Sequence, residues 1–194
     1  MNFALWKKAL KIIPSVSREE WGRLDILVNN AGMGNAAIPV EKIPLEDWDY
    51  AVALNLRSAF LCVRSAVPVM KRQGYGRIIN VSSFAGRNYS RLSGPDYGSA
   101  KAGLLGFTRH MAVELGPYGI CVNAVAPSIV LTDRVKAKWE ARTEEERQVV
   151  LSSIPLRRVG QPEEVATVIA FLASEDASYV NGVCIDINGG SYMG

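Results

Sequence analysis

The sequence predicts an α/β protein built on a parallel sheet of about four strands. Short β-branched apolar runs at residues 25–29, 76–82, 119–125 and 182–187 alternate with longer segments of helical character. Strands that alternate with helices imply right-handed crossover connections and a parallel sheet. Polar residues follow the first two apolar runs, as expected where the carboxyl ends of parallel strands form a site. The chain therefore has the plan of a single α/β domain.

The helical segments connect these strands in turn. Helices are predicted at residues 46–72 and 96–116, within 133–151, and at 162–174. The last begins at Gln161-Pro162-Glu163-Glu164, with proline at the opening and acidic residues in the first turn. No repeat and no second domain is indicated.

The chemistry is clearest at Tyr97 and Lys101, which lie four positions apart in a helical segment. Residues four apart on a helix are neighbours, so the two side chains would share one face. An ammonium group beside a phenol stabilises the phenolate and lowers its pKa from roughly 10. Tyr97 would then serve as a general acid or base. For this pair alone, an exposed lysine beside a half-buried tyrosine is the commoner arrangement, so the interpretation depends on context.

That context comes from the ends of two predicted strands. The run at 25–28 is followed by Asn-Asn-Ala-Gly, and the run at 77–81 is followed by Ser82 and Ser83. Functional side chains in open parallel sheets gather at the carboxyl ends of strands. Ser83 is therefore the predicted neighbour of Tyr97 in a site.

Together these features resemble the short-chain dehydrogenase/reductase family, which includes ketoacyl-carrier-protein reductases and sugar or polyol dehydrogenases. The matching motifs cover residues 22–194, in order and at intervals like those of the family. Any one motif is weak, but their joint occurrence by chance is negligible. They are Asn29-Asn30-Ala31-Gly32, Asn55 in Leu54-Asn55-Leu56, Ser83, the Tyr97 and Lys101 pair, Val122-Asn123, Ala126-Pro127, and Asp186-Ile187-Asn188-Gly189-Gly190.

The resemblance implies catalytic roles for Asn55, Ser83, Tyr97 and Lys101. Tyr97 would exchange a proton with the substrate oxygen, while Lys101 would lower the pKa of Tyr97 and bind the nicotinamide ribose. Ser83 would hold the carbonyl oxygen, and Asn55 would anchor a water that links Lys101 to solvent. Hydride transfer belongs to the nicotinamide of NAD or NADP. The implied function is an NAD(P)-dependent oxidoreductase that acts on CH–OH groups and interconverts an alcohol and a carbonyl.

The resemblance also implies a set of cofactor-binding residues, with two departures from the family pattern. The family usually has glycine after Pro127, where this chain has Ser128, whose Cβ would crowd the nicotinamide or shift the turn. The interval from Ser83 to Tyr97 is one residue longer than usual, and choosing Ser82 instead would lengthen it further. The implied cofactor-binding residues are Asn30, Ala31, Gly32, Tyr97, Lys101, Pro127, Val130 and Thr132.

The largest departure lies at the amino terminus. Members of the family begin with a strand, a Thr-Gly-x-x-x-Gly-x-Gly turn and a helix whose amino terminus receives the pyrophosphate. Residues 1–24 are too few to encode these elements and contain one glycine, Gly22. We therefore expect a partial Rossmann-like, doubly wound sheet that lacks the first strands and the glycine-rich turn. Residues 22–194 would be the carboxyl-terminal portion of the family's domain, residues 1–21 an atypical leader, and cofactor binding weak.

A second glycine pattern does not replace that turn. The segment from Gly32 to Ala37 matches a Gly-x-Gly-x-x-Ala dinucleotide fingerprint and follows a strand. However, Pro39 and Pro44 fall where the required helix would run, and proline inside a helix costs about 3 kcal/mol. We therefore predict a loop here, in which Gly32 lines the adenosine side of the cofactor groove by family resemblance.

Composition excludes several other classes. The chain has 194 residues, 48% of them hydrophobic and 21% charged, which is ordinary for one domain with a core. A net charge of +3 is too small to indicate nucleic-acid binding. No metal-ligand spacing is present, and no apolar run approaches the roughly 18 residues of a membrane span. Cys62, Cys121 and Cys184 lie in apolar patterns and are interpreted as reduced core residues of a cytoplasmic protein.

Substrate identity is poorly specified. The loops at 84–95 and 128–156 would wall the substrate pocket, and the segment 133–151 is consistent with a helical lid. The first loop is polar, which suits a hydroxylated or anionic substrate such as a sugar, a polyol or an acyl-carrier thioester. A solvated loop is the alternative interpretation. The polar residues are Arg87, Asn88, Tyr89, Ser90 and Arg91.

Two functions compete at this stage. The first is the oxidoreductase with activity reduced or lost, and the second is a non-catalytic remnant that acts through its oligomer surfaces. In the family, helices corresponding to 46–72 and 96–116 pair into a four-helix bundle, and an open apolar edge at 26–28 favours association. We therefore expect a homodimer or homotetramer. Leader residues at helical spacing are expected to cover part of the exposed face, namely Phe3, Trp6, Leu10 and Ile13.

Overall fold

The computed structural model describes residues 22–34 and 36–194. The expectations for the leader residues Phe3, Trp6, Leu10 and Ile13 lie outside these described residues. The described chain forms a four-stranded sheet in the order β1-β2-β3-β4, and every neighbouring pair is parallel. The predicted α/β fold with a parallel sheet is therefore confirmed. The strands are β1 (Ile26–Asn29), β2 (Gly76–Val81), β3 (Ile120–Pro127) and β4 (Cys184–Ile187).

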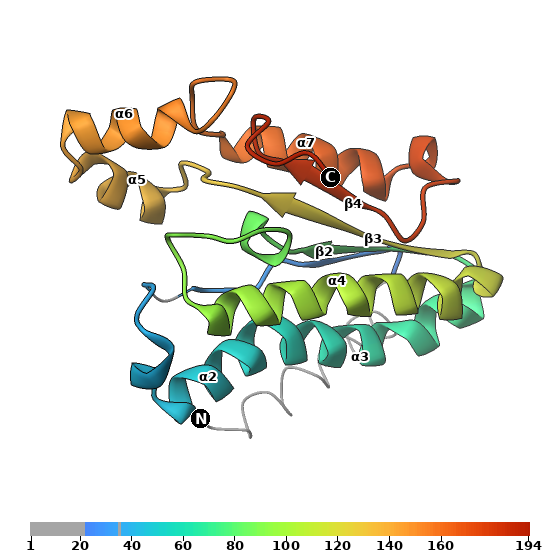
Figure 1. Cartoon of the computed structure of the whole chain (residues 1–194). Coiled ribbons are helices and arrows are strands. Elements are labelled where there is room, and N and C mark those ends of the chain that lie inside the picture. The colour runs from blue at the N-terminus through green and yellow to red at the C-terminus, as the bar shows by residue number, and fades with distance from the viewer. Residues whose placement is uncertain (1–21, 35) are drawn as a thin grey trace.

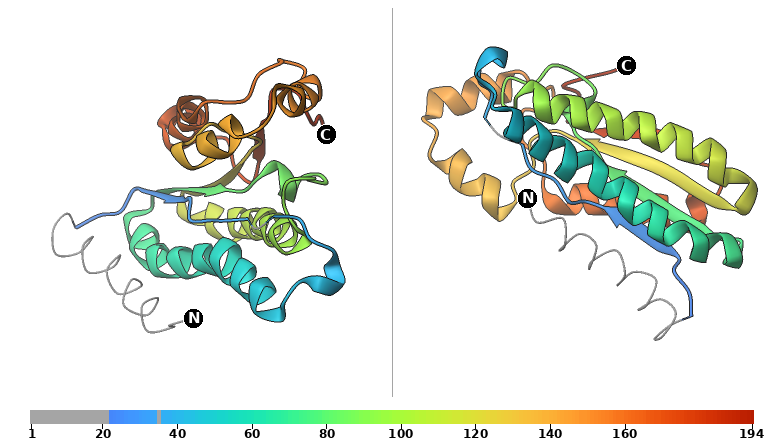
Figure 2. Two further views of the ribbon diagram at one scale, coloured as in Figure 1. Left: turned by 90° about the vertical axis from the view of Figure 1, so that its left-hand side faces the viewer. Right: turned by 90° about the horizontal axis from the view of Figure 1, so that it is seen from below.

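Helices cover both faces of this sheet (Figure 1). On one face lie α3 (Ser58–Gln73) and α4 (Pro95–Leu115), side by side, and on the other lies α7 (Pro162–Ala173). Both views in Figure 2 show the same division. Two short helices, α5 (Asp133–Glu140) and α6 (Glu144–Ser152), lie beyond the carboxyl end of β3. The layers therefore leave one end of the sheet framed by α5, α6 and the start of α4.

The helix predicted at 46–72 is interrupted by a different helical turn. It consists of α2 (Leu45–Val52), a π-helical turn at Ala53–Arg57, and α3. Such a turn inserts one extra residue into the helix, and turns of this kind occur frequently at functional sites. Here the turn contains Asn55, one of the predicted catalytic residues.

Helix boundaries follow local sequence signals. Pro95 and Pro162 occupy the first turns of α4 and α7, where a missing backbone N–H costs nothing. Thr143 and Glu146 form a capping box at the start of α6. Gly74 ends α3 with a φ of 67°, in the left-handed region that glycine adopts without strain. The predicted opening of the helix at residue 162 is confirmed.

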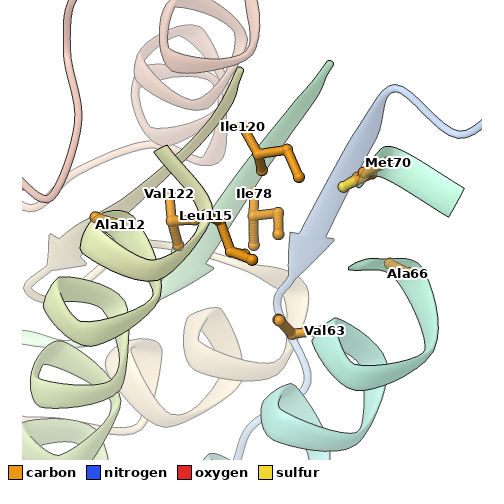
Figure 3. Close-up of a cluster of buried hydrophobic side chains, with 8 residues drawn as sticks. All are labelled: Val63, Ala66, Met70, Ile78, Ala112, Leu115, Ile120 and Val122. Carbon is orange, nitrogen blue, oxygen red and sulfur yellow. The ribbon is translucent and has the colours of Figure 1, made fainter. Parts of the chain in front are cut away.

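The core is split between the two faces of the sheet because successive strand residues point in opposite directions. Ile78 faces α3 and α4, whereas its neighbour Ile79 packs against Val125 and Leu172 on the α7 side. Both isoleucines are essentially inaccessible to solvent. Figure 3 shows the larger cluster, which consists of Val63, Ala66, Met70, Ile78, Ala112, Leu115, Ile120 and Val122.

Strand β1 forms one edge of the described sheet and is only partly covered. It pairs with β2 alone, and Ile26 and Val28 remain 47% and 40% exposed. Leu27, which points to the opposite face, packs against the cluster formed with α3 and α4. The predicted open apolar edge at 26–28 is therefore present in the described residues.

One helical stretch of the described chain differs from expectation. Leu45–Gln73 is long and apolar enough to cross a membrane by length and composition, whereas the sequence analysis expected no such run. Core helices have the same properties, and this stretch contributes Val63, Ala66 and Met70 to the main cluster. Its apolar side chains thus pack against the sheet.

The three cysteines are free, as predicted, but none lies fully in the core. Cys62, Cys121 and Cys184 are each partly buried. Burial raises the pKa of the Cys184 thiol to about 11 and also raises that of Cys62. The Cys121 thiol donates a hydrogen bond of 3.7 Å to the Ser178 carbonyl.

Candidate active site

Two predicted catalytic residues, Ser83 and Tyr97, lie together where the carboxyl end of β2 meets the first turn of α4. Ser83 caps a short 3-10 turn at Phe84–Gly86, and its Oγ accepts a hydrogen bond from the Ala85 N–H at 3.1 Å. The Tyr97 phenol is hydrogen-bonded to the Ser83 side chain. By contrast, the Ser82 hydroxyl is buried and donates to the Lys101 carbonyl at 2.8 Å. The structure thus brings Ser83, and not Ser82, to the phenol.

Lys101 lies one turn after Tyr97 on α4 and is almost wholly buried, with 3% exposed. Its ammonium nitrogen donates to the Val81 carbonyl at 2.8 Å and lies 5.7 Å from the centre of the Tyr97 ring. Burial lowers the pKa of Lys101 from 10.5 to about 8. Removing water from the charged ammonium costs free energy, so burial favours the neutral amine of Lys101.

The pKa of Tyr97 departs from expectation. Burial raises it above the ordinary value, while the hydrogen bond to Ser83 and the positive charge of Arg134 act in the opposite direction. The sequence analysis expected Lys101 to lower this pKa, and that expectation is wrong for the described geometry. The reason is that burial of the phenol outweighs the influences that lower its pKa, while the Lys101 ammonium is directed at the Val81 carbonyl. A phenol in this setting stays protonated at neutral pH.

Asn55 is buried on the π-helical turn and holds the loop that follows β1. Its Oδ1 accepts from the Met33 N–H at 3.0 Å, and its Nδ2 donates to the Met33 and Ala51 carbonyls at 2.9 Å each. Both amide hydrogens are therefore used within the protein. Its predicted part in a water relay stays a prediction.

Gly32 lies where Asn55 and Lys101 converge. A Cβ added to Gly32 would lie 2.7 Å from Asn55 Oδ1 and 2.8 Å from Lys101 Nζ. Both distances are too short for a carbon atom, so only glycine permits this approach of the backbone. The structure therefore gathers Asn55 and Lys101 around the loop after β1, with Tyr97 and Ser83 alongside.

The remaining predicted cofactor-binding residues lie in loops at the same end of the sheet. Asn30 and Ala31 follow β1 and are exposed. Pro127 ends β3, Val130 pairs with Gly160 in an isolated bridge, and Thr132 is the exposed N-cap residue of α5. Their predicted part in binding the ribose and nicotinamide stays a prediction.

Arg87 and Arg134 have surroundings that the sequence did not predict. Arg87, predicted to make a substrate loop polar, pairs with Asp186 of β4 at 3.0 Å and donates to the Gly194 carbonyl at 2.7 Å. It therefore fastens this loop to the carboxyl terminus. Arg134 was missed as a site residue, because a charged residue in a predicted lid helix carries no signal that it affects Tyr97. The described residues contain no group of three or more metal-ligating side chains.

Stability should depend on pH through Lys101. Because its pKa is about 8 in the fold and 10.5 as a free side chain, the unfolded chain binds more protons between these values. Stability therefore rises as pH increases through this window, and the full cost of burying the charge is present below it. We expect the free energy of unfolding to gain about 1–3 kcal/mol between pH 7.5 and 10, relative to Lys101→Met. Urea unfolding at both pH values measures this. Equal changes in the two proteins would contradict it.

Comparison with known proteins agrees with this geometry. A family profile described as Enoyl-(Acyl carrier protein) reductase matches residues 8–192. The 3-oxoacyl-[acyl-carrier-protein] reductase FabG of Thermotoga maritima is 44% identical over 172 residues, covering 89% of this chain and 68% of that protein. Nodulation protein G of Azospirillum brasilense is 41% identical and covers 87% of this chain and 66% of its own length.

Solved structures show the same fold. YwfH, an NADPH-dependent reductase involved in bacilysin biosynthesis, superposes with a TM-score of 0.88 at 28% identity, over 97% of this chain and 74% of that one. A 3-oxoacyl-[acyl-carrier protein] reductase from Brucella melitensis with bound NAD gives a TM-score of 0.81 at 34% identity, over 95% and 68%. On the profile match, the relatives and the arrangement of Ser83, Tyr97 and Lys101, the chain belongs to the short-chain dehydrogenase/reductase family.

Proposed function

We propose that this chain is an NAD(P)-dependent oxidoreductase that reduces a carbonyl to an alcohol, with a 3-oxoacyl thioester of acyl carrier protein as the first substrate to test. The observation that carries the proposal is the Tyr97 phenol, bonded to Ser83 and one helical turn from buried Lys101. The names of the relatives support the substrate class, since several of the matched proteins are 3-oxoacyl-[acyl-carrier-protein] reductases.

The residues present fit half of the cofactor. The close approach of Gly32 to Lys101 leaves room for backbone but for no side chain, and Thr132 stands exposed at the start of α5. Tyr97, Lys101 and Thr132 would hold the ribose and nicotinamide, and loops with Asn30, Ala31, Gly32, Pro127 and Val130 would flank them. When bound, the reduced nicotinamide supplies the hydride.

The protein supplies the proton and the position. Ser83 donates a hydrogen bond to the substrate oxygen, an interaction that strengthens as negative charge develops there. Tyr97 donates its phenolic proton to the same oxygen, and its raised pKa keeps that proton in place at neutral pH. Lys101, charged below a pH of about 8, would serve the cofactor ribose, since its ammonium is directed at the Val81 carbonyl and not at the phenol oxygen. The arrangement suits reduction better than oxidation.

Cofactor affinity should be weak in this 194-residue chain. The sequence contains no Thr-Gly-x-x-x-Gly-x-Gly turn, so the pyrophosphate lacks its backbone donors and helix terminus. Losing two charge-assisted hydrogen bonds of about 1.5–3 kcal/mol each would weaken binding by roughly 10²- to 10⁴-fold. Calorimetric titration with NADH and NADPH, beside the Thermotoga maritima relative as control, measures this. Affinity equal to that of the relative would show that another segment replaces the turn.

Turnover decides between the two functions. Oxidation of NADPH at millimolar concentration, with a 3-oxoacyl thioester, should be slow but measurable. A chain that turns over neither this substrate nor a simple ketone would favour the alternative, a non-catalytic member that acts through its interaction surfaces.

We further propose a homodimer or homotetramer in the cytoplasm. The outer face of α3 and α4 presents Phe60 and Val113, which are 44% and 81% exposed. An apolar helix face of this kind favours association with a second copy. Sedimentation velocity at micromolar concentration measures the state, and a monomer would contradict the proposal.

A further inference from the structure

We propose that Gly32 and Gly34 form a side-chain-free ledge that fixes the positions of Lys101 and Tyr97, with Gly34 a positioning residue for the phenol. The inference rests on the proposed catalytic role of Tyr97. It also explains the Gly32-Met33-Gly34 pattern, which the sequence analysis did not interpret as a dinucleotide fingerprint. Residues 36–39 after it indeed form no helix in the described chain.

Gly34 lies close to the phenol ring of Tyr97. A Cβ added to Gly34 would lie 3.1, 3.2 and 3.3 Å from the Cγ, Cδ2 and Cδ1 atoms of Tyr97. These contacts are shorter than the roughly 3.5–4.0 Å at which carbon atoms pack. Three ring atoms are crowded at once, so the missing side chain faces the ring itself. Any other residue at position 34 would have to push the ring or the loop by several tenths of an ångström.

The loop has little freedom to yield. Met33, between the two glycines, is bound through both its N–H and its carbonyl to the buried Asn55 side chain. Gly32 is closed in by Asn55 Oδ1 and by Lys101 Nζ, which is itself bonded to the Val81 carbonyl. One buried amide therefore anchors the segment in register with Lys101 on one side and Tyr97 on the other.

The helix that carries Tyr97 is also held from its other side. A Cβ on Gly98 would lie 3.2 Å from the Ala85 carbonyl, and one on Gly86 would lie 2.7 Å from the backbone of Lys101. The turn that contains Ser83 is thus packed closely on the start of α4. With loop and helix both anchored, the element that moves when a methyl group is added at position 34 is the phenol ring.

Displacement of the ring has a defined chemical consequence. The bond from Tyr97 to Ser83 would lengthen, and this bond is one of the two influences that lower the pKa of Tyr97. The pKa should therefore rise further in Gly34→Ala. A small misplacement of a reacting group reduces the rate without weakening substrate binding, so kcat should fall by about 10- to 100-fold while KM changes little.

The test compares Gly34→Ala and Gly34→Val with Gly116→Ala. Gly116 lies at the opposite end of α4, and its added Cβ would meet only Asn181 Nδ2 at an ordinary 3.6 Å. We expect kcat to fall in the order wild type, alanine, valine. The pKa of the Tyr97 phenol, followed by NMR of ¹³C-labelled tyrosine and assigned with Tyr97→Phe, should rise in the same order. Gly116→Ala should match the wild type.

The experiment distinguishes failure of the positioning role of Gly34 from failure of the proposed reductase function. If Tyr97→Phe abolishes turnover while Gly34→Ala matches Gly116→Ala in kcat and in phenol pKa, the ledge is wrong and the function stands. If turnover is absent throughout, the phenol pKa still decides. In the unmutated chain, the Gly34 Hα protons should show nuclear Overhauser contacts to the Tyr97 ring. Their absence would overturn the inference even if the variants fail to fold.

Discussion

Replacing Tyr97 with phenylalanine should lower kcat by about 10²- to 10⁴-fold, the usual contribution of a positioned general acid. The substitution keeps the ring that packs against Gly34 and removes only the hydroxyl group that bonds to Ser83. The proton for the substrate oxygen would then have to come from solvent. Steady-state oxidation of NADPH at saturating substrate measures the loss.

Tyr118→Phe is the matched control for this experiment. Tyr118 lies in the 3-10 turn after α4, 44% exposed, where its ring contacts the Lys71 ammonium. The same deletion of a hydroxyl there should leave kcat unchanged. A Tyr97→Phe variant that retains the wild-type rate would remove the phenol from the mechanism and leave the reductase proposal without its main support.

Replacing Leu115 with alanine should lower the free energy of unfolding by about 2–5 kcal/mol. Leu115 is the last residue of α4, fully buried in the cluster of Figure 3 beside Ala112, Ile120 and Val122. Truncation removes apolar contacts and leaves a cavity that close-packed neighbours fill only in part. Urea unfolding followed by circular dichroism gives the difference.

Val149→Ala is the control for that loss. Val149 lies on α6, away from the helix face proposed for association, and is 68% exposed. Its truncation should change the free energy of unfolding by no more than about 0.5 kcal/mol. Equal destabilisation by both substitutions would mean that the burial of Leu115 does not account for the loss.

Much of this fold is readable from the sequence because its signals are local. Strand β2 contains Ile78, Ile79 and Val81 and is buried along almost its whole length, and the start of α7 has proline followed by acidic residues. The proximity of Tyr97 and Lys101 was also predictable, since both lie on α4 and their spacing alone makes them neighbours.

Features that depend on contacts distant in sequence were not predictable. Arg87 pairs with Asp186, a residue 99 positions away. The residues around Arg87 give no sign that its side chain forms an ion pair and does not point into solvent. Asn55, on the π-helical turn, is hydrogen-bonded to Met33, 22 residues earlier. The direction of the Lys101 ammonium, toward a carbonyl of β2, likewise depends on how helix and strand pack. The pKa of Tyr97 was misjudged because its largest influence is burial, which also depends on how distant elements pack.

The exclusively parallel sheet also determines how the chain must fold. No strand has a hairpin partner, because each pair in the described sheet is joined by a crossover. The buried bond from Asn29 to Asn80, for example, closes a separation of 51 residues. Contacts of such length form only after the loop entropy is overcome, so refolding should take roughly milliseconds to seconds, a time that stopped-flow circular dichroism can measure. Throughout that interval unpaired strands are exposed to other chains, so recovery of native protein should improve as the refolding concentration is lowered.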